Sequence, residues 1–341
     1  MSTNQKIKTA LVGFGKSATT FHLPLLECIR DYEIISVVSS REDVVKSRLP
    51  NVAVFRDLDE LLTNSEVDLV IITTPNHLHF PQAKKSILAR KHVVVEKPFV
   101  LNPLHGKELI ELANKSNVKL SVYHNRRWDS GYLTLKTLIA NGELGEINLY
   151  EVRYDRYRPE VVDRWREGDI EGAGILWDLS PHFIDQALQL FGQPEDVIPD
   201  IAIQRVGGKS VDYFHIIFKY PKHRVILRSS SLTQNKTTHM TVQAEKGTFI
   251  RYDLDPQEES LKNGYNPKWE NWGINNIENS FIYKSNGGRI KVDVEKGCYE
   301  EYYKLMAKAI KDNGPVPVLP KDGLEVIKII RQIENKFKVL V

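Results

Sequence analysis

The chain has 341 residues, of which 41% are hydrophobic and 27% are charged, a composition that excludes wholesale disorder. Its 47 lysine and arginine residues nearly balance its 44 aspartate and glutamate residues. The net charge of +3 therefore argues against nucleic acid or an anionic membrane as the main partner.

Cysteine content and apolar runs narrow the class of protein further. The two cysteines, Cys28 and Cys298, lie far apart and exclude a disulfide framework or a cysteine-based zinc site. The N-terminus lacks the apolar core of a signal peptide, and no apolar run approaches the roughly 20 residues that a bilayer requires. These features predict a cytoplasmic protein, and its length predicts two domains of about 150 residues each.

The first third of the chain alternates short β-rich runs with helical stretches. The predicted strands are 7–12, 34–39, 52–55, 69–73, 93–95 and 120–123. The predicted helices run from the glycines after the first strand to about residue 30, and over 57–62, 81–90 and 104–116. Near-continuous apolar strands separated by amphipathic helices are typical of a parallel sheet covered on both faces. We therefore predict a doubly wound Rossmann domain over residues 1–124.

Strand-like segments dominate the remainder, residues 125–341. Strands are predicted at 147–157, 211–218, 224–231, 240–244 and 248–252, and helices at 130–140, at 181–191 and from the proline-rich segment 314–320 to about 337. Alternation of period two is clearest at 240–244. We predict an α/β domain for substrate binding with a large open, mainly antiparallel sheet. This sheet is expected to form the contact of a homodimer or homotetramer. Packing of the last helix against the first domain is a second possible arrangement.

A glycine-containing turn follows the first predicted strand. Residues 13–18 fit the pattern G-x-G-x-x-A. Its first glycine permits a tight turn, its second lets a pyrophosphate approach the backbone, and the small Ala18 lets the next helix pack closely on the strand. That helix directs backbone amides at the phosphates. The predicted dinucleotide contacts in this turn are Gly13, Phe14, Gly15 and Lys16.

The end of the second predicted strand favours NADP(H) over NAD(H). NAD-binding proteins usually carry an acid there that hydrogen-bonds the ribose hydroxyls. Here the chain has Ser40 and Arg41, whose hydroxyl and guanidinium would bind a 2′-phosphate that a carboxylate would repel. Because Glu42 and Asp43 follow at once, NAD(H) stays an alternative, as does an Arg41 side chain that only faces water.

Three further stretches carry the pattern of a redox site. They are residues 73–79 (Thr-Thr-Pro-Asn-His-Leu-His), the triplet 96–98 (Glu-Lys-Pro) and residues 178–182 (Asp-Leu-Ser-Pro-His). With the glycine turn, and in this order, they resemble the Gfo/Idh/MocA oxidoreductases, the family of glucose–fructose oxidoreductase and inositol dehydrogenase. Within this family, residues 124–129 and 158–167 look most similar to the NADP-dependent scyllo-inositol dehydrogenases.

The resemblance implies roles for individual residues. Lys97 and His182 would face the reacting carbon, Asp178 would assist them, and Glu96 would lie near the nicotinamide ribose. It also implies a cis peptide bond before Pro98. Further cofactor contacts are expected at Thr73, Thr74, Pro75, Asn76, His79, Asn125, Trp165 and Arg166, and further substrate contacts at His124 and Tyr157.

Acid–base chemistry supports the catalytic assignment separately from the resemblance. Oxidation of a secondary alcohol requires removal of the hydroxyl proton, which a group titrating near neutrality does best, and this favours histidine. Ser180 is expected to cap a helix whose first residue is Pro181, so that His182 lies in its first turn. Lys97 is expected at the carboxyl end of a parallel strand, where its ammonium can stabilise alkoxide charge.

Several other polar residues allow two interpretations. The arginines at 153, 156, 158, 164 and 166 suit a polyhydroxylated or anionic ligand or the phosphates of NADP, but also a solvated strand edge with salt bridges. His22 fits either the substrate site or the core. No carboxylate accompanies His77 and His79 at ligand spacing, so no metal is predicted.

These features together predict an NADP(H)-dependent dehydrogenase. The reaction expected is interconversion of a secondary hydroxyl of a cyclic polyol or sugar with its ketone, with scyllo-inositol and its inosose as the first candidates. Another sugar dehydrogenase or reductase of the family is an alternative, as is a non-catalytic NADP(H)-binding regulatory protein. A third is an enzyme that uses bound NAD as a transient redox group in glycoside cleavage.

Overall fold

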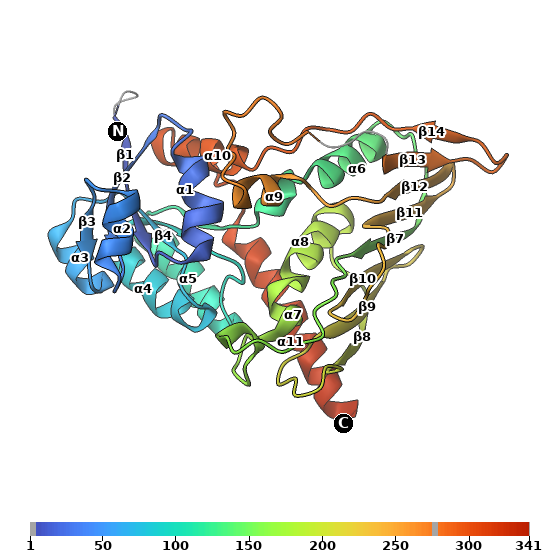
Figure 1. The fold of residues 1–341 in the computed structure, drawn as a ribbon, viewed down its shortest axis with the longest axis horizontal. Coiled ribbons are helices and arrows are strands. Elements are labelled where there is room, and N and C mark those ends of the chain that lie inside the picture. The colour runs from blue at the N-terminus through green and yellow to red at the C-terminus, as the bar shows by residue number, and fades with distance from the viewer. Residues whose placement is uncertain (1–4, 275–278, 341) are drawn as a thin grey trace. The chain divides into compact units, whose positions relative to one another are not determined.

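The computed structural model describes residues 5–274 and 279–340 (Figure 1). The chain forms two compact units, each assembled from three segments of sequence. Unit 1 comprises Met1–Asn125, Gln257–Trp272 and Cys298–Ile327, and unit 2 comprises Arg126–Pro256, Gly273–Gly297 and Lys328–Val341. The sequence predicted a single boundary after residue 124. The structure differs in that two later segments, Gln257–Trp272 and Cys298–Ile327, also belong to unit 1.

Unit 1 is built on a six-stranded parallel sheet. The strands are β1 (Ile7–Val12), β2 (Tyr32–Val38), β3 (Ala53–Phe55), β4 (Leu69–Ile72), β5 (His92–Val95) and β6 (Leu120–Val122), in the spatial order β3-β2-β1-β4-β5-β6. All four residues of β4 are buried, as expected for a strand covered on both faces. The strand order reverses between β1 and β4, which is the point where doubly wound proteins bind nucleotides. The Rossmann prediction is therefore confirmed.

The helices of unit 1 come from distant parts of the sequence. They are η1 (Ser17–His22), α1 (Leu23–Leu26), α2 (Glu42–Arg48), α3 (Leu58–Asn64), η2 (Asn76–Leu78), α4 (His79–Leu88), α5 (Pro103–Lys115), α9 (Gln257–Lys262), α10 (Glu300–Lys311) and the start of α11 (Pro320–Leu340). The helix after the glycine turn begins with π-helical geometry and ends at Leu26, short of the predicted residue 30. The hydroxyl of Tyr302 in α10 donates to Ser121 of β6 at 2.9 Å, so this late helix is part of the unit 1 core.

Unit 2 is built on an eight-stranded sheet. The strands are β7 (Ile147–Arg153), β8 (Asp196–Ala202), β9 (Tyr213–Lys219), β10 (Arg224–Ser230), β11 (Met240–Ala244), β12 (Gly247–Arg251), β13 (Ser280–Tyr283) and β14 (Arg289–Lys291). Figure 1 shows them in the spatial order β14-β13-β12-β11-β7-β10-β9-β8. Neighbouring strands are antiparallel except β7 and β10, which are parallel. The predicted open, mainly antiparallel sheet is confirmed.

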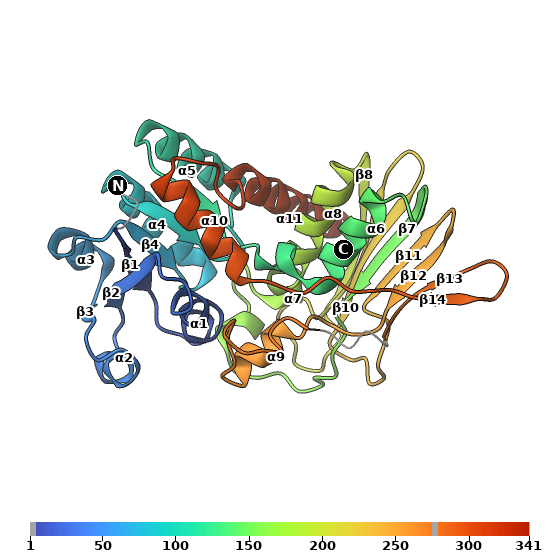
Figure 2. The same cartoon turned by 90° about the horizontal axis from the view of Figure 1, so that it is seen from above.

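The helices of unit 2 cover one face of its sheet. They are α6 (Ser130–Ala140), α7 (Gly174–Asp178), α8 (Ser180–Phe191) and the end of α11, with the short turns η3 (Asn125–Trp128) and η4 (Trp165–Glu167). Figure 2 shows α6, α7 and α8 on the same side of the strands. The opposite face carries half-exposed apolar side chains, including Leu149, Ile217 and Ile226, and no described helix of unit 2 lies on it.

Strand β8 is absent from the predicted elements, and its composition explains why. Pro199 lies in its middle and Asp196 and Asp200 flank that proline, which argues against a strand. Because β8 is the last strand of the sheet and pairs only with β9, a missing N–H at Pro199 is tolerated. Across the described residues, no helix is both long enough and apolar enough to span a membrane.

Candidate active site

The glycine turn at the end of β1 leaves its backbone open. Gly13 has a φ of +91°, and a Cβ atom there would lie 3.1 Å from Thr74 Cγ2 and 3.2 Å from Thr73 Oγ1. A larger residue at this position would be strained and would press on the neighbouring loop. At Gly15 a Cβ atom would meet nothing within 4 Å, so this stretch of backbone is accessible to a ligand. Phe14 is instead buried, and Lys16 is exposed.

Arg41 reaches back to the glycine turn from the end of β2. Its Nη2 donates to the carbonyl oxygen of Phe14 at 2.9 Å, and its backbone N–H donates to Ser39 Oγ at 3.1 Å. Ser40 beside it is exposed. A guanidinium is therefore present at the edge of the turn.

The loop after β4 is fastened to its surroundings by side chains. Thr73 Oγ1 donates to the carbonyls of Val12 and Gly13, at 3.1 and 3.0 Å, which joins this loop to the glycine turn. His79 is fully buried, and its ring nitrogens lie 2.7 Å from the carbonyl of Pro98 and 3.0 Å from that of Thr74. Burial lowers the pKa of His79, which favours the neutral ring. Pro75 and Asn76 lead into η2 and are half-buried.

Glu96 and Lys97 follow β5 directly, and the carboxylate of Glu96 is held by three groups of unit 1. One oxygen accepts from the Ser17 hydroxyl and lies 2.8 Å from His22 Nε2, and the other accepts from the Lys97 backbone N–H at 2.9 Å. Burial alone would raise the pKa of Glu96, but the hydrogen bonds from His22 and Ser17 and the charge of Lys97 lower it to about 2. The peptide bond between Lys97 and Pro98 is cis, as the resemblance implied.

His22 belongs to the core of unit 1. Its ring is fully buried, and its Nδ1 lies 2.5 Å from the hydroxyl of Tyr303 in α10. The ring centroid lies 4.1 Å from that of Tyr123. Because a carboxylate only accepts hydrogen bonds, a neutral His22 donates to Glu96 from Nε2 and accepts the Tyr303 hydroxyl at Nδ1. Of the two interpretations of His22, the core position is the one observed.

The expected catalytic groups of unit 2 lie where α7 meets α8. The prediction that Ser180 caps α8 is wrong, since α8 begins at Ser180 and the Ser180 hydroxyl donates to the Leu176 carbonyl at 2.5 Å. Leu179 has helical dihedral angles, so the chain lacks the extended residue that a side-chain cap needs. Pro181 is accordingly the second residue of α8 and His182 the third, still in the first turn.

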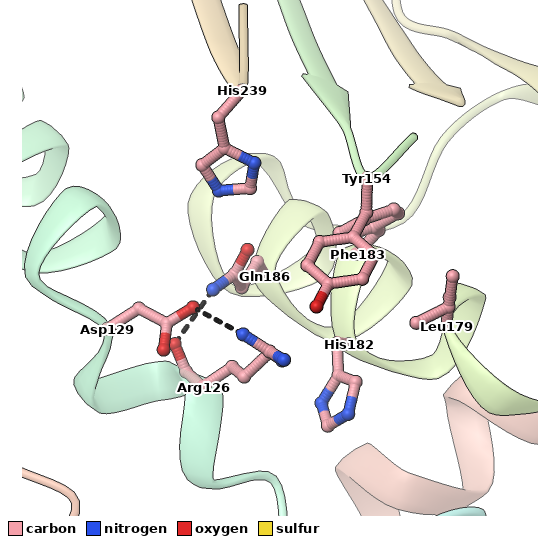
Figure 3. Close-up of a pocket in the computed structure, with 8 residues that line it drawn as sticks. All are labelled: Arg126, Asp129, Tyr154, Leu179, His182, Phe183, Gln186 and His239. Atoms are coloured by element: carbon pink, nitrogen blue, oxygen red, sulfur yellow. Dashed lines mark hydrogen bonds and ion pairs between the residues drawn. The ribbon is translucent and has the colours of Figure 1, made fainter. Parts of the chain in front are cut away.

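Asp178 and His182 border different hollows of unit 2. The His182 hollow, shown in Figure 3, is lined by Arg126, Asp129, Tyr154, Leu179, His182, Phe183, Gln186 and His239. Gln186 Nε2 donates to the Arg126 carbonyl at 2.7 Å, which joins α8 to η3. His239 Nδ1 donates to the Arg153 carbonyl at 2.7 Å, and burial lowers the pKa of His239 to about 4. The ring of His239 is therefore neutral near pH 7, with Nε2 available as an acceptor.

A second hollow, the arginine hollow, adjoins the first at Leu179. It is lined by Arg156, Arg158, Arg164, Arg166, Glu167, Gly174, Ile175, Asp178, Leu179, Arg205, Ser210, Ser229, Ser230 and Ser231. Arg166 Nε lies 4.0 Å from Asp178 Oδ1, and the Arg166 guanidinium lies 4.9 Å from the Trp165 ring centroid. The hollow takes in about 470 Å³ of space, open solvent included, against about 270 Å³ for the His182 hollow.

The other predicted contacts differ widely in exposure. His124 and Asn125 are buried at the end of β6, whereas Tyr157 is 52% exposed and forms an isolated β-bridge with Leu232. The described residues contain no group of three or more His, Cys, Asp or Glu side chains that could hold a metal ion.

Sequence reasoning missed several residues around these sites. Arg126 and Asp129 lie in the segment 124–129 that the resemblance had singled out, and this signal could have found them. His239 and Gln186 had no such signal, because each reaches the His182 hollow through the pairing of elements far apart in sequence. Tyr303, the partner of His22, lies 281 residues away from it.

The fold and the turn at its switch point define a two-unit α/β oxidoreductase with a dinucleotide-binding Rossmann domain. The chain belongs to the Gfo/Idh/MocA oxidoreductase family. Residues 7–124 match the family's NAD-binding Rossmann fold, and residues 136–338 match its C-terminal alpha/beta domain.

Individual relatives align over almost the whole chain. The uncharacterized oxidoreductase YdgJ of Escherichia coli is 41% identical over 96% of this chain and 95% of its own. The scyllo-inositol 2-dehydrogenase (NADP(+)) IolW of Bacillus subtilis is 38% identical over 95% of this chain and 92% of its own. The crystal structure of the Bacillus subtilis oxidoreductase YvaA matches with a TM-score of 0.94 and 36% identity, covering 98% of this chain and 97% of that one.

Proposed function

We propose that this protein is an NADP(H)-dependent dehydrogenase that interconverts a secondary hydroxyl of a cyclic polyol or sugar with its ketone. Scyllo-inositol and its inosose are the first candidates, because a relative with that printed activity is 38% identical over 95% of the chain. The observation that carries the proposal is the pair Glu96–Lys97 at the carboxyl end of β5, in the same sheet as the open glycine turn. Ligands of doubly wound sheets collect at this edge.

The residues around the glycine turn fit a dinucleotide phosphate. The open backbone at Gly15 allows a pyrophosphate to approach, and Thr73 and Thr74 pack against Gly13 from the neighbouring loop. Arg41 at the edge of the turn supplies a guanidinium for the 2′-phosphate, and Ser40 supplies a hydroxyl. When bound, the nicotinamide supplies the hydride that is exchanged with the substrate carbon. Asn76, His79, Asn125, Trp165 and Arg166 are proposed as further cofactor contacts, direct or through the loops that they hold.

In the proposed mechanism the protein moves only a proton. His182 accepts the hydroxyl proton of the alcohol or returns it to the ketone, and Lys97 donates to the same oxygen to stabilise its alkoxide charge. The carboxylate of Asp178 supports His182 by electrostatic attraction to the imidazolium form. Glu96 orients Lys97 through the Lys97 backbone N–H, at 2.9 Å. His124 and Tyr157 are proposed as additional substrate contacts.

The decisive experiment is a panel of polyols assayed with NADP and NAD in parallel. The panel includes several inositols and glucose, and reduction of the cofactor is followed by absorbance. We expect turnover of an inositol with NADP and at least about tenfold lower kcat/KM with NAD, the loss of one charge-assisted contact.

Each alternative function predicts a different result. Binding of NADPH with no turnover of any polyol would favour a regulatory protein. Cofactor retained through purification without net reduction would favour the transient redox chemistry of a glycoside-cleaving enzyme.

We also propose that the uncovered face of the unit 2 sheet forms a dimer or tetramer contact. Half-exposed Leu149, Ile217 and Ile226 give this face a mixed apolar character that suits a subunit interface. A monomeric mass in light scattering at working concentration would contradict this proposal.

A further inference from the structure

The arginine hollow carries more positive than negative charge. Five arginines line it, against two acids, Glu167 and Asp178. Glu167 pairs with Arg164 at 2.5 Å and with Arg205 at 3.0 Å, and Asp178 lies 4.0 Å from Arg166. Within the described residues, no ion pair compensates the remaining two arginines, Arg156 and Arg158.

The two uncompensated guanidiniums lie close enough to affect each other. Burial, followed by the charges of Arg156 and Arg164, lowers the pKa of Arg158, and Tyr154 and Asp178 offset this only in part. The Arg156 guanidinium lies over the ring of Tyr154 at 4.3 Å from its centroid, a contact that orients it without neutralising it. The cluster is therefore repulsive as it stands, and a bound anion would relieve the repulsion.

A buried serine gives a second and independent indication of a ligand. Ser210 lines the arginine hollow and is only 7% exposed, yet its hydroxyl oxygen has no hydrogen-bond partner among the described residues. Buried hydroxyls are nearly always hydrogen-bonded, because leaving one unpaired costs free energy. A ligand oxygen in the hollow would supply the missing partner.

The segment 158–167, which carries three of the arginines, is held in place by the buried Arg205. The buried Arg205 donates from Nη1 to the backbone carbonyl of Glu160 at 3.1 Å and to the Glu167 carboxylate at 3.0 Å, and from Nε to Asp212 at 3.0 Å. These bonds fix residues 158–167 against the sheet. The backbone that carries Arg158 therefore needs little reorganisation when a ligand binds.

We propose that the arginine hollow is a binding site for the oxyanion group of a small molecule, a phosphate or a carboxylate. The planar forks of Arg156 and Arg158 match the paired oxygens of either group, and Ser210 donates to a further oxygen. A neutral polyol would leave the repulsion between the guanidiniums unrelieved.

Two small molecules could bring this oxyanion, the cofactor and the substrate. Leu179 lines both hollows and Asp178 lines the arginine hollow, so a ligand anchored there extends toward His182. This position favours a polyol or sugar that carries an acidic substituent. The oxyanion site does not depend on the proposed reaction, whereas its assignment to the substrate rests on the proposed function.

The test measures binding of inorganic phosphate to the full-length protein without any turnover. Thermal unfolding is followed as phosphate replaces chloride at constant ionic strength, because a ligand of the folded state raises Tm by an amount that grows with the ratio of its concentration to its Kd. Arg158→Gln should weaken phosphate binding about 10- to 100-fold, and Ser210→Ala about 10-fold. Neither should unfold the protein, since Arg158 is exposed and the Ser210 hydroxyl has no partner to lose.

A matched control removes one positive charge elsewhere in unit 2. Arg289→Gln, on the edge strand β14, should bind phosphate like the wild-type protein. A phosphate response that is absent, or equal in all four proteins, would overturn the proposal. Repeating the titration with saturating NADPH identifies the source of the oxyanion. Binding that persists supports the site as one for the substrate, and binding that NADPH abolishes supports it as one for the cofactor phosphates.

Discussion

The two units treat charge in opposite ways at their candidate sites. In unit 1 a single carboxylate, that of Glu96, is surrounded by donors from Ser17, His22 and the Lys97 backbone, and its pKa falls to about 2. In unit 2 the arginine hollow keeps Arg156 and Arg158 without an ion-paired carboxylate among the described residues. The charge of the first site is balanced by groups of the protein, whereas the charge of the second site is balanced only when a ligand binds.

This difference distinguishes a residue that positions a neighbouring side chain from residues that bind a ligand. A carboxylate whose oxygens are already occupied by protein donors cannot also serve a ligand at full strength, so Glu96 is best understood as the support of Lys97. Arginines that repel one another gain most from an incoming anion. The variants below either break the completed network of unit 1 or sharpen the contrast with unit 2.

The largest expected effect follows removal of the Lys97 ammonium. Lys97→Ala should lower kcat/KM about 10³-fold or more, because the donor to the developing alkoxide is lost, while the Kd for NADPH changes little. Steady-state kinetics and NADPH fluorescence titration measure the two quantities. Lys115→Ala, an exposed lysine at the end of α5, is the matched control and should behave like wild type. Substantial residual turnover in Lys97→Ala would remove its catalytic role.

The second largest effect is expected on stability, from loss of the hydrogen bonds that His22 forms with Glu96 and Tyr303. His22→Phe keeps a buried ring but leaves Glu96 without one donor and the Tyr303 hydroxyl without its acceptor, at a cost of about 3 kcal/mol in the free energy of unfolding. Tyr303→Phe removes only the hydroxyl and should cost about 1 kcal/mol. Urea unfolding monitored by circular dichroism gives both values. Equal losses in the two variants would contradict a network centred on Glu96.

The sequence predicted only part of this difference between the two candidate sites. The apolar runs of β1, β4 and β5 and the exact position of Lys97 after β5 could be predicted, because buried parallel strands place the residue that follows them at the ligand edge. The pairing of His22 with Tyr303 could not, since 281 residues separate them and only the packing of α10 brings them together.

The cap expected at Ser180 illustrates a second limit. Ser-Pro before a helical run is a start signal, but here a preceding short helix, α7, leads into α8 almost without interruption. The serine hydroxyl then donates backward to Leu176 instead of accepting from the next turn. Local patterns therefore predicted most elements of unit 1, but they missed β8, β13, β14 and α10 and failed where α7 continues into α8.

Substitution of Arg41 tests whether unit 1 also contains a guanidinium that binds a ligand phosphate, at the glycine turn. Arg41→Ala should raise the Kd for NADPH about 10- to 100-fold and leave that for NADH within a few-fold, because only the former carries a 2′-phosphate. The single bond of Arg41 to the Phe14 carbonyl is to a neutral acceptor, so its loss should barely alter stability. Arg48→Ala, in α2, provides a control of equal charge. An equal change in both affinities would show that Arg41 does not read the phosphate.

His239 extends the comparison to pH, because it is a neutral ring in the His182 hollow, near Arg126 and Arg251. Its pKa of about 4 lies below the ordinary value of 6.5, since burial outweighs the hydrogen bond to Arg153. The unfolded chain thus binds the proton more readily than the folded one, and the stability that His239 contributes is present above pH 6.5 and lost as the pH falls toward 4.

Replacing this ring with an amide should flatten the stability profile. His239→Asn keeps a donor to the Arg153 carbonyl but cannot titrate, so between pH 7 and pH 5 it should lose up to about 2 kcal/mol less stability than wild type. Chemical unfolding at the two pH values provides the comparison, and at pH 7 the two proteins should differ by about 1 kcal/mol or less. Parallel losses on acidification would mean that His239 takes up its proton in the folded state as readily as in the unfolded chain. In that case the ring would be positively charged near Arg126 and Arg251 at mildly acidic pH, and unit 2 would hold clustered positive charge in the His182 hollow as well as in the arginine hollow.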